Sequence, residues 1–461
     1  MFENKNRLPL YLLAIFLLSL APRLLSAYYA PLFDSSDFIW SYKIVAENIY
    51  QSGCVSQSII VGECKPHWGG NQLPGYPLFI AVVWKMFNHS NLAILIVQST
   101  LLSLAITYLF YVLTIRFTKQ HKIIPFAVAS LLIISPLVLV FSRVPETEIL
   151  TIALRILLIA ILIRSITINR LLILGSAFTY TAAMFVRYDN ILLGIPIIIA
   201  AFIIYKPQMA LKKLLLGMVI CSIPMGGWWM RSVANGLPVF PPANFPVDTL
   251  DVSAWFNTWI KDRADTYFML AMFHAKNYSE LQVRQDIFYS DTERNKTADL
   301  WSKLKKADGN FIPQELNRDF RDLTQMRKEA SWFDTVVVLK LVRMRNYWFN
   351  FGYYHWAVGK YQENLHFLRK LVYLSYDIYR MALTPILFLL TYLIFRKKAP
   401  IELKFLTGGV ALFVVLYTIF YGMMPLILTR YILTTVPLLE AAIVASLAWL
   451  YVEHKNKVAI V

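Results

Sequence analysis

Charged residues are scarce in this chain. Asp, Glu, Lys and Arg make up 16% of its 461 residues, whereas hydrophobic residues make up 57%. Ordinary globular chains carry about 25% charged and roughly 45–50% apolar residues. This composition excludes a conventional soluble protein and is typical of a protein embedded in a lipid bilayer. The apolar runs also lack the alternation that a membrane barrel strand needs, so we expect them to be helices.

Metal-binding motifs are absent as well. The seven histidines are scattered, and neither an HExxH nor a CxxC pattern occurs. Zinc sites are usually recognised in a sequence by such patterns. The sequence therefore identifies no metal ligands and no cofactor with certainty, and an acid pair that holds a divalent cation is the weaker alternative.

Cysteine is nearly absent, with three residues in the whole chain. Cys221 falls in an apolar run and is predicted to be a packed, inert thiol. Cys54 and Cys64 share one polar loop, where an oxidising compartment favours a disulfide. Such a bridge would pin the loop rather than carry out chemistry.

What the sequence does have is a series of apolar runs near bilayer length, about 20 residues each. They predict an all-α polytopic membrane protein with about ten transmembrane helices. The predicted spans are Leu8–Ala27, Asn91–Ile115, Ile124–Phe141, Ile149–Ile163, Leu171–Val186, Ile191–Tyr205, Leu214–Met230, Asp377–Phe395, Phe405–Tyr421 and Tyr431–Val452. The N-terminal run lacks a clear small-x-small cleavage site and is interpreted as an uncleaved first span.

The distribution of charge orients these spans. Residues 231–376 hold 20 basic and 16 acidic residues, and the rest of the chain holds 25 basic and 12 acidic ones. Many of those remaining basic residues lie in short loops, which is the positive-inside pattern. We therefore predict a multi-pass protein of the inner (plasma) membrane with both termini cytoplasmic. The net charge of +17 then needs no nucleic acid as its partner.

The loops divide the chain into three parts. Residues 1–230 form an N-terminal transmembrane module that includes a first periplasmic loop at 28–90. Residues 231–376 form a large, helix-rich periplasmic loop, and residues 377–461 return to the membrane. In the first loop, Asp37–Tyr50 and Leu78–Phe87 are predicted to be helices that lie along the surface. In the large loop, Asp334–Phe349 becomes aromatic, as expected at the membrane–water boundary.

Ionisable residues gather near the outer ends of the predicted spans. Charges at this depth are expensive and suggest a functional site, although each one alone could instead snorkel to the headgroups. Acids and arginines approach from several separate loops, which favours one shared site. The set comprises Arg23, Asp34, Asp37, Arg143, Glu146, Glu148, Arg187, Asp189, Arg231 and Arg430.

The acids of this layer are the candidate catalytic groups. Asp37 is our first choice for a general base that removes a proton from an acceptor hydroxyl, and Asp34 is the second. Asp37 is equally well placed to cap a helix that begins near Phe38. Glu146 and Glu148 precede the fourth span, where either acid would also complement a positive helix start. Being two residues apart they do not share a helix face, so we expect one of them, Glu148, to reach the site.

The arginines of this layer suit a phosphate. Guanidinium groups bind phosphate oxygens bidentately and stay charged when partly buried. The candidate donor-phosphate ligands are Arg187, Arg231, Arg345 and Arg430, together with Lys65 and His67 of the first loop.

The order of these motifs resembles membrane glycosyltransferases of the GT-C fold, in the branch of the protein O-mannosyltransferases and the aminoarabinose transferase (glycosyltransferase family 39). The matching motifs are Arg23-Leu24, Asp37, Tyr42…Ala46…Asn48, Leu73-Pro74-Gly75-Tyr76-Pro77, Thr147-Glu148, Arg187, Trp229…Arg231, Arg345…Trp348-Phe349 and Arg430-Tyr431…Pro437. The resemblance implies a GT-C-like fold and a transferase that uses a polyprenyl-phosphate-linked sugar at the outer face. It makes the first-loop Asp the base and adds Tyr76 to the substrate-binding set.

This chain departs from the family pattern at two positions. Phe38 follows Asp37 where members often have Glu, and Gln72 stands where a basic residue often precedes the Pro-Gly-Tyr motif. Lys65 is the candidate substitute for that basic residue. The expected partners are a polyprenyl-phosphate-linked sugar donor, a lipid, glycan or protein acceptor, and membrane lipid.

Two other functions share much of this charge layout. A transporter or flippase of lipid-linked or small substrates would place paired ionisable residues near the bilayer midplane, and Arg155 and Glu440 are the nearest to such positions. An O-antigen polymerase or ligase would also act at the outer face. The first-loop Asp and the Pro-Gly-Tyr motif favour the transferase.

Overall fold

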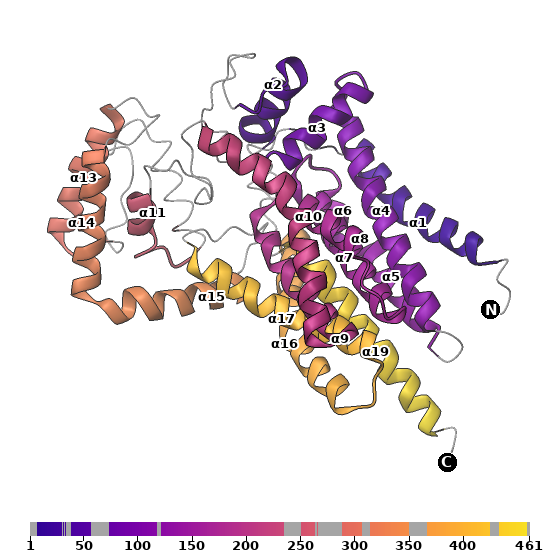
Figure 1. Cartoon of the computed structure of the whole chain (residues 1–461). Helices are drawn as coiled ribbons and strands as arrows, with labels where there is room; N and C mark the ends of the chain where they lie inside the picture. The colour runs from indigo at the N-terminus through magenta and orange to yellow at the C-terminus, as the bar shows by residue number, and fades with distance from the viewer. Residues whose placement is uncertain are drawn as a thin grey trace. The chain divides into compact units, whose positions relative to one another are not determined.

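A computed structural model describes most of the chain. The described residues are 7–29, 31, 33, 38–56, 73–117, 121–234, 250–262, 265, 288–306, 314–349, 367–424 and 433–458. They form helices and connections, and no β-strand occurs among them (Figure 1). The predicted fold class is confirmed: this is an all-α polytopic membrane protein.

Among the described residues, seven helices are long and apolar enough to cross a membrane. They are α1 (Leu8–Tyr29), α4 (Asn91–Arg116), α7 (Thr147–Thr167), α10 (Pro207–Ala234), α16 (Phe367–Arg396), α17 (Ile401–Met423) and α19 (Val436–Val458). Each contains or overlaps a predicted span. The other three predicted spans coincide with shorter apolar segments, which are α5 (Ile123–Ile134) with α6 (Pro136–Phe141), α8 (Ile173–Val186), and a 3-10 turn, η4 (Tyr188–Leu193), followed by α9 (Gly194–Ile204).

The third predicted span is broken into two helices at Ser135. Pro136 has no backbone N–H, so the carbonyl of Leu132 loses its normal helical donor. A guanidinium nitrogen of Arg23 takes over this role and donates to the Leu132 carbonyl at 2.9 Å. Arg23 itself is fully buried in α1 and also contacts Ser19. Its charge therefore satisfies a freed backbone group within the apolar region, as helix breaks in membranes require.

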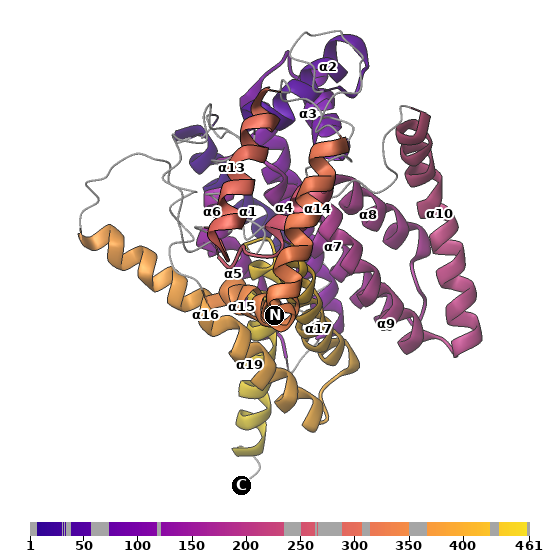
Figure 2. The ribbon, with the colours of Figure 1, turned by 90° about the vertical axis from the view of Figure 1, so that its left-hand side faces the viewer.

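The chain separates into two compact units. The first comprises Met1–Met230, Tyr354–Leu416 and Leu433–Val461. Within it, α7 is buried along nearly its whole length and packs against α4 and α8 (Figure 2). This burial explains why α7 is apolar on all sides, with polar exceptions such as Arg155 that are themselves buried.

Both helices that were predicted in the first loop are present. One is a π-helical turn, η2 (Phe38–Lys43), that continues as α2 (Ile44–Ser52), and the other is α3 (Gly75–Met86). The second begins three residues earlier than predicted, because Pro74 and Gly75 already belong to its start. Cys54 is disulfide-bonded and Cys221 is free, while Cys64 lies outside the described residues.

The second unit comprises Arg231–Tyr353 and Tyr417–Ile432. Its helices are α11 (Leu250–Phe256), α13 (Asp291–Lys306), α14 (Gln314–Ala330), a π-helical turn, η8 (Asp334–Val338), and α15 (Leu339–Phe349). Its core contains Trp255 and Phe320. The buried Glu293 accepts a hydrogen bond from the Trp255 indole at 3.1 Å and pairs with Arg327, so this acid is satisfied.

Candidate active site

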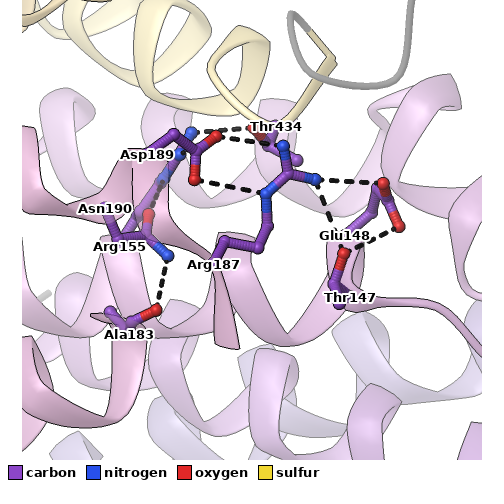
Figure 3. Close-up of polar contacts among 8 residues, drawn as sticks. All are labelled: Thr147, Glu148, Arg155, Ala183, Arg187, Asp189, Asn190 and Thr434. Carbon is purple, nitrogen blue, oxygen red and sulfur yellow. Dashed lines mark hydrogen bonds and ion pairs between the residues drawn. The ribbon is translucent and has the colours of Figure 1, made fainter. Parts of the chain in front are cut away.

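The candidate site is built where α8 ends. The helix stops at Val186, Arg187 turns to an extended conformation, and η4 follows. The Asn190 side chain donates to the carbonyl of Ala183 at 2.8 Å and thereby caps the end of α8. This tight return leaves the Arg187 and Asp189 side chains side by side (Figure 3).

Arg187 joins two carboxylates. One edge of its guanidinium contacts Asp189, with Nε 3.2 Å from Oδ1 and Nη2 3.0 Å from Oδ2. Its Nη1 donates to Oε1 of Glu148 at 3.1 Å (Figure 3). All three side chains are buried. Burial strengthens such pairs, and it also makes an uncompensated charge costly.

Glu148 comes from the first turn of α7. Its carboxylate lies at the positive end of that helix. Arg155 lies seven residues further, two turns along the same helix face. Its Nη2 is 3.3 Å from Asp189 Oδ2 and its Nε donates to Asn190 at 2.8 Å. The face of α7 that carries Glu148 therefore meets the turn after α8 at two points.

The C-terminal part of the first unit closes the network. Thr434, just before α19, accepts a hydrogen bond from Arg155 Nη1 at 2.8 Å. The Arg155 guanidinium also lies over the Phe413 ring, 5.3 Å from its centroid. Arg430 lies outside the described residues and precedes Thr434 by four positions in the sequence.

Tyr76 approaches the acids from α3. It is completely buried, and its hydroxyl donates to Gln98 at 3.2 Å, while Gln98 donates to the carbonyl of Val144 at 2.9 Å. Burial, and then the negative charges of Glu146 and Glu148, raise the pKa of the Tyr76 hydroxyl well above its usual value. Tyr76 is therefore a neutral donor next to the loop that carries both acids.

Gly75 explains the Pro-Gly-Tyr motif. A Cβ added at this position would lie 2.5 Å from the backbone carbonyl of Phe185, two residues before Arg187. A helix start can approach the end of α8 this closely only without a side chain. The motif therefore docks α3 beside the turn that positions Arg187.

Phe38 follows the predicted base Asp37 in the sequence. Asp34 and Asp37 lie outside the described residues, but Phe38 is buried in one hydrophobic cluster with Tyr76, Leu150 and Val186. Val186 immediately precedes Arg187, and Leu150 lies two residues after Glu148. The chain next to Asp37 is therefore packed against the residues that position the Glu148–Arg187 pair.

Four further residues belong to the predicted site. Lys65 and His67 lie outside the described residues, and Arg231 is partly buried at the end of α10. Arg345 belongs to the second unit, is exposed, and contacts its neighbour Asn346. No group of three His, Cys, Asp or Glu side chains in the described part of the chain is arranged to hold a metal ion.

Sequence reasoning missed four members of the network, namely Arg155 as a partner of Asp189, together with Gln98, Asn190 and Thr434. The seven-residue spacing from Glu148 to Arg155 was the signal available for Arg155. Nothing in the sequence indicated Thr434, which is 279 residues away from its partner.

Residues 69–229, about a third of the chain, match the family model described as dolichyl-phosphate-mannose-protein mannosyltransferase. The matched segment contains Tyr76, Glu148, Arg155 and Arg187. No curated protein and no solved structure matches the chain. The family match supports a GT-C glycosyltransferase-like membrane protein, in agreement with the predicted resemblance.

Proposed function

We propose that this GT-C glycosyltransferase-like membrane protein transfers a sugar from a polyprenyl-phosphate-linked donor to an acceptor hydroxyl at the outer face of the membrane. The family description names a lipid-phosphate-linked sugar as the donor of that family and protein as its acceptor. For this chain we propose the class of donor and not the identity of the acceptor. We also propose that the chain lies in the inner (plasma) membrane with both termini cytoplasmic.

One observation carries the proposal. Phe38, the residue after Asp37, shares a buried cluster with Tyr76, Leu150 and Val186. Four segments distant in sequence thus pack together beside the Glu148–Arg187 pair, and three of them carry the Tyr76 hydroxyl, Glu148 and Arg187. Buried ionisable groups that converge in a membrane protein are expensive to maintain and favour a functional site.

The proposed reaction is a direct displacement at the anomeric carbon of the donor sugar. The acceptor oxygen forms a bond to that carbon, the bond to the phosphate oxygen breaks, and the acceptor's proton passes to Asp37. Arg187 stabilises the charge on the departing phosphate, with Arg430, Lys65 and His67 as further candidate ligands. Arg187 also pairs with Glu148, the alternative base.

The test is transfer by the purified full-length chain in nanodiscs, supplied with radiolabelled polyprenyl-phosphate sugars. Asp37→Asn is expected to lower transfer by about 10²–10⁴-fold, the usual contribution of a general base. The matched control is Asp299→Asn, an acid-to-amide change on the exposed face of α13, which should retain wild-type activity.

Near wild-type transfer by Asp37→Asn would move the base to Asp34 or Glu148. Absence of transfer by the wild type, with movement of labelled substrate across sealed vesicles, would instead establish the transporter alternative.

A further inference from the structure

Asp189 is shared between two arginines. Its Oδ2 lies 3.0 Å from Nη2 of Arg187 and 3.3 Å from Nη2 of Arg155 (Figure 3). The Asp189 carboxylate is buried, and Arg155 is completely buried. A carboxylate in such a place needs a cation next to it at all times. Because two arginines contact Asp189, one of them can leave while the other still compensates its charge.

All three guanidinium nitrogens of Arg187 contact a carboxylate in this arrangement. One edge of its guanidinium contacts Asp189, and the remaining nitrogen contacts Glu148. A phosphate that binds to Arg187 bidentately must therefore replace one of the carboxylates. Asp189 presents its two oxygens to the bidentate edge, and it is the partner that a second arginine also contacts. Asp189 is thus the carboxylate that Arg187 can leave at the lower cost.

Arg155 cannot follow Arg187 toward a ligand. Its Nε donates to Asn190 at 2.8 Å, its Nη1 donates to Thr434 at 2.8 Å, and its guanidinium lies over Phe413. These partners belong to the turn after α8, the segment before α19, and α17. A guanidinium fixed from three directions provides a stationary positive charge beside Asp189.

We propose that Arg155 is a positioning residue, which keeps Asp189 charged and in place while Arg187 exchanges Asp189 for the phosphate of a lipid-linked donor. The proposal rests on the proposed function, since it assumes that the ligand is a polyprenyl phosphate. Arg155 touches neither the donor nor the reacting atoms. Its effect is on how readily Arg187 is released.

The experiment measures binding of geranylgeranyl phosphate to the full-length chain in nanodiscs, with geranylgeraniol as the uncharged comparison lipid. Wild type should bind the phosphate lipid more tightly than the alcohol. Arg155→Met removes one of the two arginines that contact Asp189, so affinity for the phosphate lipid should fall on the order of 10²-fold.

The decisive variant combines Arg155→Met with Asp189→Asn. Once the carboxylate is neutral, Arg187 no longer has to compensate it, and affinity should recover to within about tenfold of the wild type. A purely structural role of Arg155, through Asn190 and Thr434, predicts that the double variant binds no better than Arg155→Met. That result would overturn the inference. Asp189→Asn alone should bind at least as tightly as the wild type.

Two further variants guard against misfolding. Arg155→Lys keeps a charge at this position and should bind within about tenfold of the wild type, so an affinity as weak as that of Arg155→Met would contradict the proposal. Arg380→Met removes another completely buried arginine, paired with Asp377 in α16, and should lower the unfolding temperature without weakening phosphate binding.

The outcomes also separate the two proposals. If the wild type does not prefer geranylgeranyl phosphate over geranylgeraniol, the proposed donor class is wrong. If the wild type shows the preference but the double variant does not recover it, only the role of Arg155 is wrong.

Discussion

At the scale of single residues, the candidate site depends on a glycine. The start of α3 lies against the backbone of Phe185, where an added Cβ would be 2.5 Å from its carbonyl carbon and oxygen. Backbone atoms cannot move aside as a flexible side chain can. Gly75→Ala should therefore displace α3 from the end of α8, lower the unfolding temperature and reduce transfer at least about tenfold.

The matched control is Gly226→Ala on α10, where a new Cβ would meet nothing within 4 Å. That change should be neutral, or stabilising by about 0.5–1 kcal/mol, because alanine is the better helix former. Equal effects of the two substitutions on thermal unfolding would show that the close approach at Gly75 is not needed.

Lys340 in the second unit has a lowered pKa. Burial first, and then the positive charges of Arg343 and Lys328, lower its pKa to about 8. Its Nζ donates to Asn257 at 2.7 Å. We expect acetylation of Lys340 by acetic anhydride, followed by mass spectrometry across a pH series, to rise with a midpoint near pH 8. The exposed Lys303, whose pKa is raised by its hydrogen bond to Asp299, should react only at higher pH.

The lowered pKa of Lys340 also determines how the free energy of unfolding changes with pH. Between about pH 8 and the ordinary lysine value the unfolded chain holds more protons than the folded chain, so this group makes stability rise with pH over that window. Below pH 8 the free-energy cost of burying the protonated Lys340 is present in full. A midpoint for Lys340 equal to that of Lys303 would contradict the electrostatic account.

The sequence indicated individual members of the network more readily than their partners. Glu148 and Arg187 were predicted because charges at span ends are rare and their chemistry is plain. The pairing of Arg187 with Asp189, and of Asp189 with Arg155, depends on how the chain turns after Val186. Apolar periodicity does not encode that turn, and the contact with Thr434 depends on the packing of helices from opposite ends of the chain.

At the scale of elements, hydrophobic runs located the spans because bilayer thickness sets their length. They did not show that the third span is broken at Ser135. Pro136 was visible in the sequence, but prolines also occur inside α1, α10 and α16, which continue past them. What decides the outcome at Pro136 includes the contact of Arg23 with Leu132, a feature of tertiary structure.

This contact gives a double-mutant test of the helix break. Arg23→Met should destabilise the protein by about 1–3 kcal/mol, because the Leu132 carbonyl is left without its donor. In a Pro136→Ala background the N–H of residue 136 can serve that carbonyl, so the same substitution should cost less. Thermal unfolding of the four proteins in detergent measures the coupling, and additive effects would show that Arg23 does not act through Leu132.

The helix α15 carries an exposed apolar stripe. Leu341 and Phe349 are 58% and 50% exposed, and Trp332 and Phe333 before η8 are exposed as well. Other side chains of the helix pack on the last turns of α17, where the Trp348 indole donates to Thr418 at 2.5 Å and Tyr347 stacks on Tyr421. Since α17 is long enough to span a membrane, we expect the exposed stripe to lie at the outer membrane boundary.

Nitroxide labels test this placement in nanodiscs. Labels on Leu341→Cys and Phe349→Cys, in a Cys221→Ala background, should be accessible to oxygen and protected from a water-soluble nickel chelate. A label on Asp299→Cys of α13 provides the aqueous reference. Equal accessibility at all three positions would place α15 in water.

At the scale of the whole molecule, the proposed function requires the network to face outward. Arg187 follows α8, and α8 begins just after the basic segment that ends at Arg170. If that segment is cytoplasmic, as the positive-inside pattern predicts, then the end of α8, the start of α7 and the segment before α19 all reach the outer face. The site and the second unit would then share the compartment in which Cys54 is oxidised.

Cysteine labelling in intact cells tests this topology, again in a Cys221→Ala background. A membrane-impermeant maleimide should label Lys303→Cys, on the exposed surface of α13, without permeabilisation. Lys212→Cys at the start of α10 and Lys398→Cys after α16 are also exposed positions, and they should react only after the membrane is opened. Labelling of Lys212→Cys from outside would invert the first unit and turn the Glu148–Arg187 pair toward the cytoplasm. Because a donor consumed at the outer face could not then reach this pair, the proposed reaction would have to be abandoned even if the protein bound polyprenyl phosphate.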